Sequence, residues 1–124
     1  KTRPLLRSAL GLAYLGSLDH TDRQHILNVN RRINTLDVGD RAILANIDRY
    51  LAEVHQRGYA FSAGLIEENI SAIALPVRRG QKPLGAVNIV FFRSAMSHAE
   101  VAATCLKPLR ECIARAEAAM QTQT

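Results

Sequence analysis

The stretch from Gly58 to Phe92, GYAFSAGLIEENISAIALPVRRGQKPLGAVNIVFF, constrains the fold more than any other part of the chain. Two runs rich in apolar and β-branched residues, Ile70–Val77 and Leu84–Phe92, predict two strands. The turn between them, residues 78–83, contains the Gly and Pro that turns favour. A short strand is expected at Tyr59–Phe61, followed by a loop at Ser62–Asn69. The stretch therefore predicts a buried hairpin that directly follows a helix.

The predicted hairpin has two different faces, because successive side chains of a strand point to opposite sides. One face carries the bulky side chains that a packed core requires: Ile73, Leu75, Val77, Val87, Ile89 and Phe91. The other carries mostly small or apolar side chains and one amide: Ala72, Ala74, Pro76, Ala86, Asn88, Val90 and Phe92. Small residues leave room for a ligand, and Asn88 supplies a hydrogen-bonding group. On the residues alone, the alternative is that Ala72 and Ala74 only permit close helix packing and that Asn88 is solvated.

Two helices are predicted before the helix that leads into the hairpin. Pro4 to Leu18 is apolar on all sides with small residues interspersed, which is typical of a buried helix. A second helix is expected from Asp22 to about Ile33, with Thr21 and Gln24 forming a capping box. Small residues in the first helix allow another backbone, or a ligand, to approach it closely.

The clearest periodicity lies in the helix that leads into the hairpin. We expect Asp40 to cap it and Gly58 to end it in the left-handed conformation. Its apolar residues recur with the 3.6-residue period: Ile43, Leu44, Ile47, Tyr50, Leu51 and Val54.

A long C-terminal helix is predicted to begin at a capping box formed by Ser97 and Glu100. Pro108 lies inside this helix, removes one backbone hydrogen bond and is expected to kink it. The residues expected to face inward are Val101, Cys105, Leu109, Cys112, Ile113, Ala116 and Met120. Together these elements predict a single α+β domain.

Composition excludes several classes of protein. The 124 residues suffice for one domain with a core, and no run of about 18 uncharged apolar residues predicts a membrane span. The first 20 residues resemble a signal peptide only superficially, since no Ala-x-Ala cleavage site follows; we expect a domain fragment of a longer, cytoplasmic protein. The formal charge of +5 is spread along the chain without interleaved aromatic residues, which favours a solvated surface over direct DNA contact.

The two cysteines, Cys105 and Cys112, fit neither a disulfide nor a metal site. Seven residues of helix separate them by roughly 10 Å, too far for a disulfide within one helix. Their spacing matches no zinc pattern, and no metal or other cofactor is expected. We therefore expect free, buried thiols.

Four segments, in order, resemble the effector-binding domain of the IclR family of bacterial transcription regulators. They are residues 4–15 (PLLRSALGLAYL), 49–60 (RYLAEVHQRGYA), 67–77 (EENISAIALPV) and 84–89 (LGAVNI). The resemblance spans nearly the whole chain. It implies a GAF-like antiparallel sheet flanked by helices, whose first strands would precede Lys1.

The resemblance also implies a function and partners. Such a domain senses a small molecule, forms homodimers or homotetramers, and acts on DNA through a winged helix-turn-helix domain that this sequence does not match. The Asn-Ile-Ser and Val-Phe-Phe segments are most similar to activators of 3-(3-hydroxyphenyl)propionate catabolism. An aromatic carboxylic acid is therefore the expected effector, and neither its identity nor activation versus repression follows from the sequence.

Carried over by position, the family's ligand-binding residues fall at Ala9 and Leu10, at Ser62 or Ala63, and at Ala72, Asn88 and Val90. Relative to the family pattern, an acidic residue is replaced by the Ser62–Gly64 segment, a Cys by Ala72 and a Ser by Val90. These departures favour a larger, less polar ligand than a small oxoacid. Arg7, the Ser8 hydroxyl or free helix N–H groups are expected to hold the carboxylate, and Asn88 to bond a ring hydroxyl.

Two other function classes are alternatives to a sensor of this family. An enzyme is disfavoured, since the four histidines lack metal-ligand spacing, both cysteines lie on an apolar helical stripe, and no phosphate loop or nucleophile elbow is present. A generic GAF-like sensor, or an oligomerisation module of another signalling protein, remains the alternative.

Overall fold

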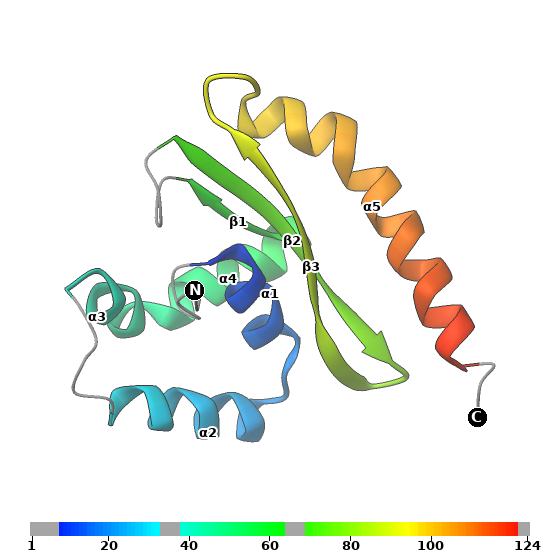
Figure 1. Cartoon of the computed structure of the whole chain (residues 1–124). Coiled ribbons are helices and arrows are strands. Elements are labelled where there is room, and N and C mark those ends of the chain that lie inside the picture. Colours follow the sequence, from blue (N-terminus) through cyan, green and yellow to red (C-terminus); the bar gives the residue numbers. More distant parts are fainter. Residues whose placement is uncertain (1–7, 33–37, 64–68, 122–124) are drawn as a thin grey trace.

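The structure, a computed structural model, describes residues 8–32, 38–63 and 69–121. A three-stranded antiparallel sheet lies at its centre, in the order β1 (Ala60–Ala63), β2 (Ile70–Arg79) and β3 (Lys82–Phe92). Helix α1 (Ala9–Ser17) packs against all three strands, and α5 (His98–Gln121) packs against β2 from the other side (Figure 1). This is the α+β architecture that the sequence predicts.

The hairpin of β2 and β3 is longer than expected. Its strands continue to Arg79 and resume at Lys82, so that the turn contains only Gly80 and Gln81. The predicted six-residue turn is therefore wrong. Gly80 has φ 62°, and a glycine at the first central position closes a two-residue hairpin of type II′ without strain. A register shift at Val77 and Arg78 leaves Leu84 as the extra residue of a bulge.

β1 also differs from the prediction. It begins at Ala60, and both Ser62 and Ala63 belong to it and not to a loop. Ser62 pairs with Ala72, and Ala63 pairs with Ser71. β1 extends to Ala63 because it pairs with residues of β2 that lie eight or more positions away in the sequence. A pattern of neighbouring residues cannot predict such pairing. Of the predicted loop, residues 64–68 lie outside the described residues.

The first two helices begin where side chains cap them. Ser8 is extended, and its Oγ accepts a hydrogen bond from the N–H of Gly11 at 2.9 Å, so α1 starts at Ala9 and not at Pro4. Residues 4–7 lie outside the described residues. Asp19 Oδ1 accepts from the N–H of Asp22 at 2.8 Å. Helix α2 (His20–Arg31) consequently starts before Thr21, and the predicted capping box of Thr21 and Gln24 is wrong.

The helix predicted between Asp40 and Gly58 is two helices, α3 (Val38–Ala45) and α4 (Ile47–Arg57). Asn46 separates them: its N–H bonds to Ile43 O at 3.0 Å, and its Nδ2 donates to Ala42 O at 2.9 Å. A side chain that competes for a helix carbonyl favours such a break. Asp40 lies within α3, so the predicted start of the helix after Asp40 is wrong. Gly58 ends α4 with φ 83°, as predicted.

α5 begins at the predicted capping box. Ser97 N–H donates to Glu100 Oε1, and Glu100 N–H donates to Ser97 Oγ, both at 3.2 Å. Cys112 and Ala116 are exposed, contrary to the prediction, whereas Leu106, which was not predicted, is buried. Pro108 is on the exposed side of α5, and the kink it was expected to cause stays a prediction.

Two cores lie on the two sides of the sheet. The α1 side contains buried apolar residues of α1, α2, α3 and α4 together with the small sheet residues Ala60, Ala72 and Ala74. The α5 side contains the bulky residues Ile73, Leu75, Val101, Leu106 and Ile113. This division follows the two faces predicted for the hairpin. No helix among the described residues is long and apolar enough to cross a membrane.

Candidate functional site

The small-residue face of the sheet consists of cross-strand rows. Residues directly opposite one another in antiparallel strands share a face, so the pairing places Ser62, Ala72 and Val90 in one row. The adjacent row is Ala60, Ala74 and Asn88. Rows two residues apart are separated by about 6.6 Å. This face, with α1 packed against it, is called the α1 face.

Small side chains bring α1 close to this face. Ala9 and Ala13 are buried in the same core as Ala72 and Ala74. Leu10 is half-buried and packs against that core. Small side chains thus occur on both sides of this contact, where polar groups are few.

Three polar groups belong to this region. Ser8 is buried; its Oγ accepts from Gly11, and its hydroxyl hydrogen is not used in that bond. Ser62 is only 8% exposed, and in the part of the chain that the structure describes its hydroxyl forms no hydrogen bond. Asn88 is half-buried, and its amide likewise has no partner among the described residues. Since buried polar groups are nearly always paired, the Ser62 hydroxyl is the polar group on this face that most requires a partner beyond the described residues.

The N-terminus of α1 adds backbone donors. In the described residues, the N–H groups of Ala9 and Leu10 have no hydrogen-bond partner, whereas those of Gly11 and Leu12 bond to Ser8. Unpaired N–H groups and the helix dipole together favour an anion at such an end.

The structure brings most of the predicted site residues together. Ser62, Ala72 and Val90 share one row, Asn88 lies in the next, and Ser8, Ala9 and Leu10 form the start of the helix that packs on this face. Ala63 differs, because the register places it opposite Ser71 and not in either row. Arg7 lies outside the described residues. Ala60 and Ala74 complete the second row and were not predicted as site residues. Their alternation with the bulky Phe61 and Ile73 indicates that they lie on the small-residue face.

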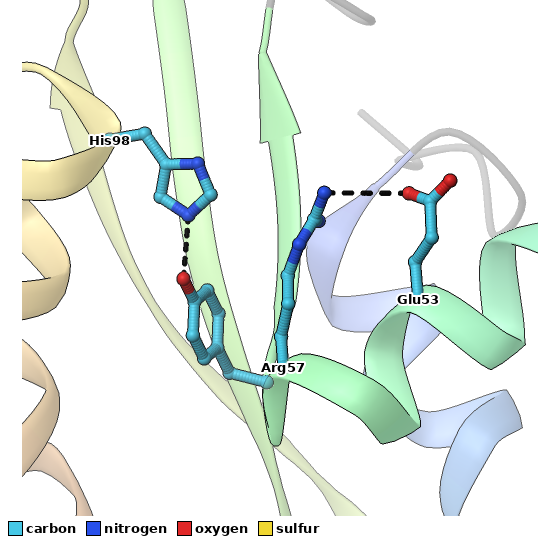
Figure 2. Close-up of polar contacts among 4 residues, drawn as sticks. Glu53, Arg57 and His98 are labelled. Carbon is cyan, nitrogen blue, oxygen red and sulfur yellow. Dashed lines mark hydrogen bonds and ion pairs between the residues drawn. The ribbon is translucent and has the colours of Figure 1, made fainter.

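The opposite face carries a polar cluster that the sequence did not indicate. Tyr59 Oη and His98 Nε2 are 2.7 Å apart, and the His98 ring stacks on Phe61 with centroids 3.7 Å apart and an angle of 5° between the planes. Figure 2 shows the His98 ring pointing toward the tyrosine hydroxyl, with Arg57 paired to Glu53 nearby. Tyr59, Phe61 and His98 are called the α5 clasp, because they join the first turn of α5 to β1.

The electrostatics of the α5 clasp favour a neutral imidazole. Partial burial lowers the pKa of His98 from its ordinary value, and the positive charge of Arg57 lowers it further. The ion pair between Arg57 Nη2 and Glu53 Oε2, at 3.5 Å, is itself exposed.

The described residues contain no group of three or more His, Cys, Asp or Glu side chains that would hold a metal ion. The cysteines are free; Cys105 is half-buried, and Cys112 is exposed, which corrects the expectation of two buried thiols. Val101 and Ile113, which are also predicted to face inward, are buried, so the inward stripe of α5 is narrower than predicted and leaves out Cys112.

A family model described as Bacterial transcriptional regulator IclR C-terminal matches residues 1–117. An IclR family transcriptional regulator from Brucella abortus has a similar structure, with a TM-score of 0.76 at 23% identity over 96% of this chain and 45% of that one. The repressor BlcR from Agrobacterium tumefaciens gives 0.76 at 21% identity over 96% and 48%. The chain thus spans about half the length of these two regulators.

A third similar structure contains a ligand. It is a double mutant of the inducer-binding domain of the PobR transcription factor from Acinetobacter, in complex with 3-hydroxybenzoic acid. Its TM-score is 0.69 at 17% identity, over 93% of this chain and 66% of that one. At identities below 25%, these likenesses concern the fold alone.

Proposed function

This chain belongs to the IclR family of bacterial transcriptional regulators, and we propose that it is the domain in which such a regulator binds an aromatic carboxylic acid. Binding would take place between the N-terminus of α1 and the α1 face. The observation that carries the proposal is the buried Ser62 hydroxyl, which has no partner within the described residues.

The chemistry of the site suits the two ends of a hydroxylated aromatic acid. The carboxylate would accept hydrogen bonds from the Ser8 hydroxyl and the N–H groups of Ala9 and Leu10, with Arg7 as a further donor. The ring would lie beside Val90, which is 44% exposed, at the margin of the α1 face next to Ala72. Ser62, in the same row as Ala72 and Val90, would hydrogen-bond the ligand through its hydroxyl, and Asn88 would hydrogen-bond a ring hydroxyl. The PobR domain, similar in fold, supports this class of ligand, since it is bound to 3-hydroxybenzoic acid.

Regulation would follow from a difference in affinity. An effector changes the arrangement of subunits only if it binds one arrangement more tightly than another. We propose that the subunits form a homodimer or homotetramer and that DNA is contacted by a winged helix-turn-helix domain of the same regulator. The proposed outcome is control of genes for aromatic compound catabolism.

A thermal-shift screen tests the effector class. The panel contains 3-(3-hydroxyphenyl)propionate, its analogue without the ring hydroxyl, and glyoxylate and pyruvate as controls. A ligand at 100 times its dissociation constant stabilises the folded state by about 2.7 kcal/mol. We expect a rise in melting temperature with the aromatic acids only; a rise with the small oxoacids alone would contradict the proposal.

Substitution of Asn88 tests the orientation of the ligand. Asn88→Leu is expected to weaken binding of the hydroxylated acid by about 1–3 kcal/mol, because the ring hydroxyl loses its partner. Binding of the analogue without the hydroxyl serves as the control, since it is expected to change little. Equal effects on both ligands, measured by calorimetry, would remove Asn88 from this role.

A further inference from the structure

β1 faces two different environments through two consecutive residues. Ser62 lies on the α1 face, buried and in the same row as Ala72 and Val90. Phe61 pairs with Ile73 and packs in the core on the α5 side, where it stacks on His98. A displacement of the backbone at Ser62 therefore also displaces the ring of Phe61.

The side chains of the α5 clasp are in direct contact, so a displacement of Phe61 must also move His98. A ring separation of 3.7 Å in a parallel stack is van der Waals contact. The 2.7 Å separation between Tyr59 and His98 fixes the imidazole from a second direction. His98 is the first residue of α5, next to the Ser97 and Glu100 capping box, so the clasp acts on the turn where the helix begins.

β1 is a short strand at one edge of the described sheet. It has four residues, pairs with β2 within the described part of the chain, and follows Gly58, whose φ of 83° makes a sharp change of direction after α4. Arg110 of α5 donates to the carbonyl of Gly58 at 3.3 Å, so this corner is also joined to α5. The further attachment of α5, Glu117 Oε2 accepting from the N–H of Arg78 at 2.7 Å, is to β2.

We propose that β1 transmits changes on the α1 face to the N-terminus of α5 through the clasp of Tyr59, Phe61 and His98. That a bound effector causes such a change in the natural protein rests on the function proposed above. The coupling itself is a property of the chain without ligand. The result of such a change is a first turn of α5 that is either less stable or more stable against local opening.

Hydrogen exchange in the ligand-free protein tests the coupling. Ser62→Leu adds volume on the α1 face, and the amides to follow are those of Glu100 and Val101, which bond to Ser97 Oγ and Ser97 O. We expect Ser62→Leu to change their exchange rates by about tenfold, as local opening of that turn is altered. Ser62→Val, a smaller change, is used if Ser62→Leu does not fold.

Two controls separate this route from general destabilisation. Gly80→Ala strains the hairpin turn, where Gly80 has φ 62°, without adding volume on the α1 face, and is expected to leave the two amides unchanged. In a Phe61→Leu background, where the stack on the His98 ring is lost, the response to substitution at Ser62 is expected to disappear. Unchanged exchange in both Ser62 variants, an equal effect of Gly80→Ala, or a response that persists without the Phe61 ring would each overturn the proposal.

Adding 3-(3-hydroxyphenyl)propionate to the wild-type protein gives a separate result. If the Ser62 variants change exchange at Glu100 and Val101 but the acid does not bind, the effector class is refuted and the coupling through β1 is retained. If the acid binds but the Ser62 variants leave exchange at these amides unchanged, the effector class is retained and the coupling is refuted.

Discussion

At the scale of single residues, His98 makes stability depend on pH. Its pKa is lowered in the folded state, first by partial burial and second by Arg57, so the unfolded chain binds more protons. The stabilisation is therefore fully present above the ordinary histidine pKa of about 6.5 and is lost as the pH falls from there through the folded value. We expect the melting temperature to fall between pH 8 and pH 5.

The matched variant for this prediction is His98→Gln, which keeps a hydrogen-bonding side chain without titrating in this range. Its melting temperature is expected to depend less on pH than that of the wild type, when both are followed by circular dichroism. His20, His25 and His55 are present in both proteins, so the difference between them isolates His98. Parallel curves for the two proteins would show that His98 does not contribute.

Residue-scale features were predictable where the signal is local. Ser97 with Glu100 and the left-handed Gly58 were predicted correctly, because each depends on neighbours within three or four positions. Thr21 and Gln24 have the residue types and spacing of a capping box, as Ser97 and Glu100 do. α2 nevertheless begins one residue before Thr21, because the Asp19 carboxylate accepts a hydrogen bond from the N–H of Asp22. The Tyr59–His98 contact joins residues 39 positions apart, and nothing in the sequence pairs them.

At the scale of elements, the hairpin turn gives a prediction with a built-in control. Gly80 has φ 62°, a conformation that costs a residue with a Cβ about 1–2 kcal/mol. Gly85 lies in the same hairpin without a positive φ, and a Cβ there would meet nothing within 4 Å. Gly80→Ala should therefore lower the free energy of unfolding by about that amount, whereas Gly85→Ala should not. Urea denaturation measures both, and equal losses would contradict the turn geometry.

Element boundaries depended on contacts that sequence patterns do not contain. The two-sided hairpin was predictable from alternation, and its faces occur as expected. The extension of β1 through Ser62 required its pairing with Ala72. The break at Asn46 interrupts a periodicity that continues on both sides, since Ile43 and Ile47 are both buried, so the stripe alone predicted one helix. The small-residue face followed from the alternation of β2 and β3, but which of Ser62 and Ala63 lies on it required the register.

At the scale of the whole molecule, the outer edge of β3 is the most unusual surface. Of the large hydrophobic side chains left exposed in the described part of the chain, all but Val29 lie on β3: Leu84, Val87, Val90 and Phe92. β3 is also the last strand of the described sheet. Open edges with apolar side chains are templates for pairing with another strand.

For the 124-residue chain studied alone, we expect this edge to pair between copies. Sedimentation velocity over a range of concentrations should then reveal self-association. Val87→Lys is expected to weaken it at least about tenfold, which corresponds to about 1.4 kcal/mol, because a charged side chain on an edge strand opposes pairing. Val29→Lys is the matched control, since Val29 is 52% exposed on α2, far from β3 in sequence, and also exposes an apolar side chain. If both variants weaken association equally, exposed apolar surface in general is responsible; if only Val87→Lys does, the association depends on the β3 edge.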